Sequence, residues 1–291
     1  MDNGNRNSLI ALPIVILIAA GLAWAGAQSG SSILGMPIFA LAVALAFVIQ
    51  WLGFIAAYAL QTEKFYDLTG SFTYISLTTL AVLLSPTIDD RSVLLMATVL
   101  IWATRLGTFL FGRIMKSGKD ERFDEIKVSF LRFLLTWTVQ GLWVSFTAAA
   151  AWAAITTTTR KPLGWLALIG FLVWAFGLGF EVLADTQKSA FKANPENKGD
   201  FIDVGLWAWS RHPNYFGEIV LWLGVAMIAL PVLRGWQWVA LISPLYVTAQ
   251  LALVSGIPIL ERKADERWGG QEDYEAYKER TPVLIPRPPR N

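Results

Sequence analysis

Eight long apolar runs divide the chain and constrain its fold more than any other feature. Each is long enough to cross the hydrocarbon core of a bilayer as a helix. Hydrophobic residues make up 55% of the 291-residue chain and charged residues only 16%, which excludes a water-soluble domain of this size. The sequence therefore predicts an all-α polytopic membrane protein, with 1–291 as a single integral-membrane domain. The runs cover 9–27, 33–60, 68–84, 93–112, 130–155, 163–184, 215–233 and 236–260.

The basic residues alternate between the connections, and this pattern predicts the topology. Lys and Arg favour cytoplasmic connections. With a cytoplasmic amino terminus, most of the 24 basic residues fall in three inward-facing segments, 113–132, 187–211 and 261–291. We expect these segments to close one cytoplasmic mouth, with the carboxy terminus inside. Without the first run there would be seven spans and the same placement of the rest. The tail is expected to form an amphipathic helix over 261–277 that breaks at two glycines.

Composition excludes several classes of site. The chain has no Cys, so disulfides and thiolate chemistry are ruled out, and its single His excludes a multi-histidine metal site. We expect no metal. A net charge of +2 gives no basis for a nucleic-acid partner. Soluble nucleotide-binding motifs are missing too, since Gly177-Leu178-Gly179 lies within a predicted span and lacks the third glycine of a dinucleotide fingerprint.

The segment from Ser210 to Glu218 concentrates polar side chains, including the only histidine, at the start of the seventh run. Polar groups at the edge of hydrocarbon are costly unless they bind one another or a ligand. One interpretation is structural: Arg211 and His212 anchor the interface, and Asn214 lies at a helix start. We favour the alternative, a binding site, because it also accounts for His212 and Glu218.

Acidic residues near the predicted inner ends of two spans support the same site. Glu181 and Asp185 are four residues apart and share a helix face, and so do Asn214 and Glu218 on the next span. Cations such as Lys188, Lys192 or Arg211 would satisfy these acids, and so would the polar hydrogens of a ligand. Interhelical ion pairs are the competing explanation for any one of them.

The carboxy-terminal third resembles the steroid 5α-reductase family, especially its bacterial branch. The matching pieces are Glu181–Asp185, Asn197–Trp207, Ser210–Glu218 and Tyr277–Pro286. Arg-His-Pro followed by Tyr and Gly is shared with sterol C14 and Δ7 reductases and, more loosely, with isoprenylcysteine and phospholipid methyltransferases. Asn214 and the Gly217-Glu218 pair favour the reductases, whose cofactor is NADPH, over the methyltransferases, whose cofactor is S-adenosylmethionine.

The resemblance implies roles for individual residues. Tyr66, Asp67 and Trp102 would lie at the substrate ketone, with Tyr66 and Trp102 replacing the Gln and Tyr of relatives. The expected cofactor-binding residues are Glu181, Asp185, Arg211, His212, Asn214, Tyr215 and Glu218, together with Arg105, Lys192, Glu261 and Arg262.

The implied reaction is conjugate reduction of an enone. Hydride adds to C5 of a 3-oxo-Δ4 steroid, a proton from water reaches C4, and a protonated Asp67 stabilises the negative charge that develops on the C3 oxygen. The expected partners are a small lipophilic enone and membrane lipid. Alternatives are a membrane methyltransferase, a sterol C14 or Δ7 reductase, and a small-molecule transporter, although the short external loops argue against a transporter.

Overall fold

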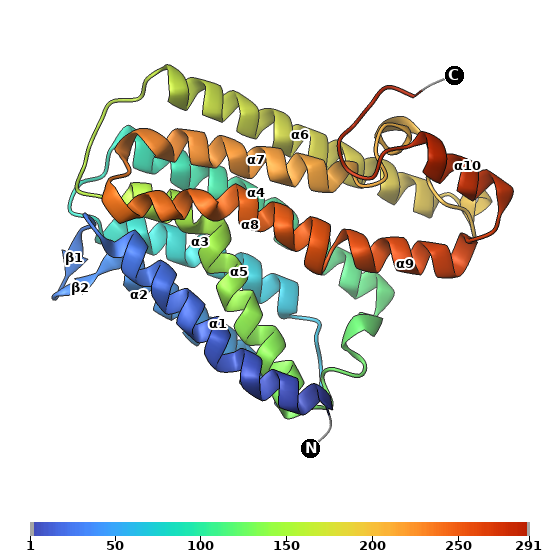
Figure 1. Cartoon of the computed structure of the whole chain (residues 1–291), viewed down its shortest axis with the longest axis horizontal. Coiled ribbons are helices and arrows are strands. Elements are labelled where there is room, and N and C mark those ends of the chain that lie inside the picture. Colours follow the sequence, from blue (N-terminus) through green and yellow to red (C-terminus); the bar gives the residue numbers. More distant parts are fainter. Residues whose placement is uncertain (1–2, 290–291) are drawn as a thin grey trace. The chain divides into compact units, whose positions relative to one another are not determined.

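The computed structural model describes residues 3–289, and within them eight helical stretches are long and apolar enough to cross a membrane. The chain is thus an integral membrane protein with an all-α fold, as the apolar runs predicted (Figure 1). The first seven are α1 Asn3–Ala27, α2 Ile38–Ala59, α3 Tyr66–Leu84, α4 Asp90–Ser117, α5 Phe130–Thr156, α6 Trp165–Ala193 and α7 Pro213–Ala229, which continues in a 3₁₀ turn to Val232.

The eighth stretch, Gly235–Trp268, is not one continuous helix as its apolar run predicted. It consists of a 3₁₀ segment Gly235–Ile242, α8 Ser243–Ala249, a π-helical turn Gln250–Val254 and α9 Ile257–Trp268. Ser255 and Gly256 separate the π-helical turn from α9. The short α10, Glu272–Arg280, follows after a break at Gly269 and Gly270, confirming the predicted break in the tail.

Two other predicted boundaries were wrong. The run 33–60 begins with a small antiparallel hairpin of β1 Ser32–Ile33 and β2 Met36–Pro37, because Leu34 and Gly35 adopt positive φ and reverse the chain. In addition, α6 continues to Ala193, well beyond the predicted end at 184. No helix breaker occurs until Asn194-Pro195, so polar residues expected in a loop extend the helix instead.

The chain divides into two compact units, one containing residues up to Ala167 with Ala226–Ser243, the other Leu168–Val225 with Pro244 onward. In the first unit α5 lies at the centre and contacts α1, α2, α3 and α4 (Figure 1). Its Ala148–Ala151 segment is fully buried, and small side chains there permit close helix packing.

Hydroxyl groups on α3 bind neighbouring helices of this unit. Gln50 of α2 donates to Thr73 at 2.7 Å, and the Trp152 indole of α5 donates to Thr78 at 2.9 Å. These contacts support close packing of this hydroxyl-rich helix against α2 and α5.

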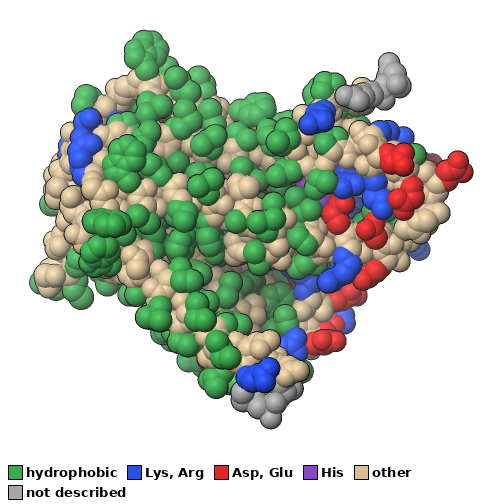
Figure 2. Space-filling model, in the orientation of Figure 1, with side chains coloured by type: hydrophobic (Ala, Val, Ile, Leu, Met, Phe, Trp, Pro, Cys, Tyr) green, Lys and Arg blue, Asp and Glu red, His purple; other side chains and the backbone are tan. Residues whose placement is uncertain are grey.

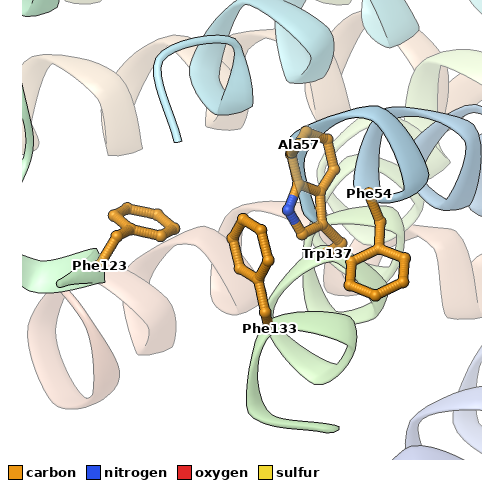
Figure 3. Packing of buried hydrophobic residues seen from close by; sticks show 5 residues of the cluster. All are labelled: Phe54, Ala57, Phe123, Phe133 and Trp137. Atoms are coloured by element: carbon orange, nitrogen blue, oxygen red, sulfur yellow. The ribbon is translucent and has the colours of Figure 1, made fainter. Parts of the chain in front are cut away.

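The segment between α4 and α5 is fastened to the α2–α3 turn by a buried acid. Glu63, only 4% exposed, accepts hydrogen bonds from the Asp120 backbone at 3.0 Å and from Lys127 Nζ at 2.9 Å. Beside this polar contact, Phe123 joins Phe133 and Trp137 in an aromatic cluster that also includes Phe54 and Ala57 (Figure 3).

In the second unit charged side chains gather over α9 and α10, whereas the visible surfaces of α7 and α8 are mainly hydrophobic (Figure 2). This division matches a helical unit whose polar residues collect at one end of its spans. The candidate site lies in this unit, where α6, α7 and α9 meet.

Candidate functional site

Glycines bring the backbones of α6 and α7 into direct contact. A Cβ on Gly217 would lie 2.6 Å from the backbone nitrogen of Glu181, and one on Gly177 would lie 2.5 Å from that of Leu221. Gly224 follows Gly217 by seven residues, and a Cβ on Gly224 would lie 2.5 Å from the Gly170 carbonyl oxygen. Only glycine permits so close an approach, and it fixes an antiparallel register for the two helices.

This register places three buried acids near the same end of the helix pair. Glu181 lies against Gly217, Glu218 is the next residue on α7, and Asp185 is one turn beyond Glu181. Their exposed fractions are 2%, 8% and 6%, respectively. Carboxylates are almost never buried to this extent unless a partner or a ligand satisfies them. The acids that their spacing placed on shared helix faces thus form one buried cluster in this unit.

His212 and Arg211 connect the start of α7 to α9 through one carboxylate. His212 Nε2 lies 2.7 Å from Glu261 Oε1, and Arg211 Nη2 lies 2.9 Å from Glu261 Oε2. The Tyr215 ring stacks on His212 with centroids 5.5 Å apart and also approaches Gly256 before α9. Three residues expected to bind cofactor thus bind one another, which fixes α9 against α7.

The other ring nitrogen of His212 has no hydrogen-bond partner among residues 3–289. Nδ1 is inaccessible to solvent, and the whole residue is only 4% exposed. Burial lowers the pKa of His212 below its ordinary value, although the Glu261 carboxylate opposes this shift. In a neutral ring that donates from Nε2 to Glu261, Nδ1 is a bare acceptor. A buried acceptor in this position suits a ligand that donates a hydrogen bond.

The segment before α7 packs against α6 and pairs with the tail. The Trp207 indole donates to the Ala184 carbonyl oxygen at 3.0 Å, and Lys188 Nζ lies 4.1 Å from a Trp207 ring centroid. The tail pairs with the segment before α7, because the Arg211 backbone donates to Pro282 and the Arg287 backbone to Trp209. Residues near the Arg-His-Pro motif are thereby held in place by main-chain hydrogen bonds.

The remaining predicted cofactor residues of this unit differ in exposure. Asn214 and Tyr215 are half-buried at the start of α7. Lys192 is exposed on the last turn of α6, and the Arg262 side chain is 69% exposed with its guanidinium 3.8 Å from Glu266. These two cations are placed to meet a charged group at the solvent-accessible surface and not a buried one.

The predicted catalytic residues belong to the first unit. Tyr66 and Asp67 begin α3; the Tyr66 hydroxyl donates to the Thr136 carbonyl oxygen at 3.1 Å, and its ring packs on Trp137. Asp67 is half-buried.

The other two predicted residues of the first unit lie on α4. Trp102 is fully buried and packs edge-on against Tyr74, while the Arg105 guanidinium lies 5.1 Å from the Phe109 ring centroid. In the expected role the Tyr66 hydroxyl would donate to the substrate ketone. In the structure it already donates to the Thr136 carbonyl oxygen.

Two structural features were not predicted from the sequence. The glycines that join α6 to α7 occur at seven-residue spacing, 170 with 177 and 217 with 224, a signal that predicts a shared helix face. Glu63, which fastens the segment before α5, had no distinguishing sequence pattern. Its role depends on Lys127 and Asp120, which are far away in the chain.

Comparison with known proteins identifies related sequences. The model of a family described as protein of unknown function (DUF1295) matches residues 53–281. A steroid 5-alpha-reductase DET2 of Gossypium hirsutum is 28% identical over 142 residues, 48% of this chain and 50% of that protein. A probable O-methyltransferase ustE of Ustilaginoidea virens is 35% identical over 66 residues, 23% of each chain.

The matched region is therefore half the length of the reductase and about a quarter of the methyltransferase. No solved structure matches the chain. These similarities are distant, and they connect the chain to proteins named as two different kinds of enzyme.

Proposed function

Since the chain belongs to the DUF1295 family and is distantly similar to a steroid 5-alpha-reductase, we propose that it is an NADPH-dependent membrane reductase of a lipophilic enone. The expected substrate is a 3-oxo-Δ4 steroid or a flat polycyclic enone of similar size, and the product its 5α-dihydro form. We also assign the cofactor site to the cytoplasmic side, following the distribution of basic residues.

One observation carries the proposal: buried hydrogen-bond acceptors cluster where α6, α7 and α9 meet. Glu181, Asp185 and Glu218 are buried carboxylates, and His212 Nδ1 is a buried acceptor with no partner among residues 3–289. Such a set suits the donors of a dinucleotide, namely the carboxamide N–H groups and the ribose hydroxyls. Burial from water strengthens each of these hydrogen bonds.

The phosphates of the cofactor require cations, and this unit has several near the acceptors. Lys188 lies over Trp207, Lys192 is exposed one turn further along α6, and Arg262 is exposed on α9. Arg211 is engaged with Glu261, so we assign it primarily to positioning α9. We thus assign the nucleosides of the cofactor to the acidic groups and its phosphates to the basic groups.

When bound, NADPH would supply a hydride to the β carbon of the enone. The chain's own task is to stabilise the negative charge that develops on the ketone oxygen. We assign this to Asp67, which must be protonated to donate, because the Tyr66 hydroxyl already donates to Thr136. Tyr66 and Trp102 then shape the substrate site, and water returns the proton to the α carbon.

Turnover and cofactor binding test the proposal separately. Purified protein incubated with NADPH and testosterone or progesterone should form the 5α-dihydro steroid, detected by mass spectrometry. Glu218→Gln and Asn214→Ala should remove the thermal stabilisation that NADPH gives the wild type. Glu196→Gln, a change at an exposed acid between α6 and α7, is the matched control. Unchanged NADPH stabilisation in both site variants would refute the cofactor assignment.

The second candidate is a methyltransferase using S-adenosylmethionine. It is favoured by the 35% identity to the probable O-methyltransferase, and buried carboxylates also suit the positive charges of that cofactor. We rank it second because the similar region is less than half as long as that shared with the reductase. A thermal shift with S-adenosylmethionine and none with NADPH would reverse this order.

A further inference from the structure

A groove of about 500 Å³ runs between α2 and α3 in the first unit. Both helices are long and apolar enough to span a membrane, so we infer that the open side of the groove faces hydrocarbon. Along the helix axis it extends about 10 Å from the α2–α3 turn, the rise of the seven residues from Leu60 back to Gly53. The lining is apolar except for one threonine: Gly53, Ala56, Ala57, Leu60, Phe65, Leu68, Thr69 and Phe72.

This groove is separate from the proposed substrate site. Leu68, Thr69 and Phe72 lie about 100–200° around the α3 axis from Asp67. The Asp67 side of the helix continues through Ser71 and Tyr74 and faces α4, since Tyr74 packs on Trp102 and Ser71 lies where a Cβ on Gly107 would clash. A molecule in the groove would therefore occupy the opposite side of α3 from the proposed catalytic acid.

The inner wall of the groove is closely packed. A Cβ on Gly53 would lie 2.5 Å from the Trp137 ring and 3.3 Å from the Thr69 methyl group, so this end is closed by direct contact. Ala57 belongs to the aromatic cluster of Phe54, Phe133 and Trp137 (Figure 3). A preformed apolar wall binds a hydrocarbon chain without the entropy cost of ordering its own side chains.

A lysine lies in the α2–α3 turn, at one end of the groove. Lys64 lies between Leu60 and Phe65, both of which line the groove, and it has no ion pair among residues 3–289. The basic residues of the neighbouring segment differ in this respect, since Lys119, Arg122 and Lys127 each bind a carboxylate. An apolar channel ending at an uncompensated lysine matches one acyl chain joined to an anionic head group.

We propose that this groove is a binding site for an anionic phospholipid. One acyl chain lies between α2 and α3, and its phosphate is bound by Lys64. The site is independent of the proposed reaction, because it lies on the other side of α3. A bound lipid would fill the space between the two helices next to the turn that Glu63 fastens.

Native mass spectrometry of the full chain tests the site with two defined probes, phosphatidylglycerol and phosphatidylcholine. We expect wild type to retain phosphatidylglycerol about fivefold more strongly, the factor that corresponds to roughly 1 kcal/mol for one basic residue at an anionic surface. Lys64→Gln should abolish this preference. Ala56→Trp, which fills the groove, should reduce retention of both lipids, whereas Ala59→Trp, on the exposed surface of α2 outside the groove, should not.

Photolabelling supplies a measurement that needs no variant. A phosphatidylglycerol with a diazirine in its acyl chain should label peptides containing residues 53–72, and excess unlabelled phosphatidylglycerol should compete. Labelling elsewhere, equal retention of the two lipids by wild type, or unchanged retention by Ala56→Trp would each overturn the proposal. Should Ala56→Trp fail to fold, the photolabelled positions decide alone.

Discussion

Gly217 of α7 lies directly against the backbone of Glu181 of α6, so close that a Cβ would come within 2.6 Å of the Glu181 nitrogen. The contact determines where both buried acids, Glu181 and Glu218, are held. Gly217→Ala should therefore separate the helices and lower stability by about 1–3 kcal/mol, the usual cost of overpacking. NADPH binding should weaken at the same time, because the acceptors move apart.

Thermal unfolding of the detergent-solubilised protein, with and without NADPH, measures both effects. Gly179→Ala is the matched control, since a Cβ at that helical position would meet nothing within 4 Å and alanine favours helix. Equal melting temperatures for the two variants would contradict the role assigned to the α6–α7 contact.

Glu63 should make stability depend on acid pH. Burial favours its neutral form, but hydrogen bonds from Lys127 and the Asp120 backbone outweigh burial and leave the pKa of Glu63 below the ordinary value of 4.5. Its contribution to stability is therefore fully present above pH 4.5 and is lost as the pH falls through the folded-state value. Glu63→Gln should be less stable than wild type at pH 7, by about 1–3 kcal/mol.

The difference between wild type and Glu63→Gln should shrink as the pH falls below 4.5. Glu121→Gln, at an exposed acid in the neighbouring segment, serves as the control. A constant difference between Glu63→Gln and wild type from pH 7 down to a pH well below 4.5 would contradict the assignment.

Two substitutions of His212 separate its two ring nitrogens. Gln places a donor near the position of Nε2 and should keep the contact with Glu261, whereas Asn retains polarity near Nδ1 and should lose that contact. We expect His212→Gln to remain close to wild-type stability but to bind NADPH about tenfold more weakly. The factor corresponds to one lost hydrogen bond to a buried acceptor.

His212→Asn should show the opposite pattern, with reduced stability and better retention of affinity. Isothermal titration and thermal unfolding of both variants supply the comparison. If affinity fell equally in the two variants, Nδ1 would not be the ligand-binding atom.

Glu261 and Arg262 are neighbours with different expected roles. Glu261→Gln removes the charge shared by His212 and Arg211 and should lower stability by about 1–3 kcal/mol. Arg262→Gln should leave the melting temperature unchanged, because that side chain is mostly exposed and its guanidinium is 3.8 Å from Glu266. It should nevertheless weaken NADPH binding and reduce the dependence of that binding on salt. Salt-independent affinity in wild type would argue against a phosphate contact at this position.

Hydropathy was sufficient to predict the all-α fold and its eight candidate spans, because twenty apolar residues in succession have few other stable arrangements. It did not predict where they are interrupted. The hairpin at Leu34 and Gly35 and the π-helical turn at Gln250 depend on local backbone conformation, to which hydropathy is insensitive. The polar residues at the end of α6 were predicted to form a loop, because the end of the apolar run was interpreted as the end of the helix.

For the candidate site, residue spacing predicted that Glu181 shares a face with Asp185 and that the Arg-His-Pro motif lies at a helix start. Pairing between distant segments could not be predicted in the same way. The bond from His212 to Glu261 spans 49 residues and depends on how α9 packs against α7. The cofactor contacts are still predictions, because they too depend on how side chains from α6, α7 and α9 come together in space.

Most of α5 is buried, yet the mean hydropathy of its 18-residue membrane-span window, 1.2, is the lowest of the eight candidate spans in the described residues. Alanines, hydroxyl groups and Gln140 suit it to protein neighbours and give it little preference for lipid. Four of the elements that it contacts, α1 to α4, are synthesised before it, whereas the 3₁₀ segments Leu230–Val232 and Gly235–Ile242, which also pack on it, follow it. Biogenesis of this chain should therefore be cooperative: α5 would leave the translocon only when the earlier helices are assembled to receive it, and a truncation that removes α1 would leave it poorly inserted.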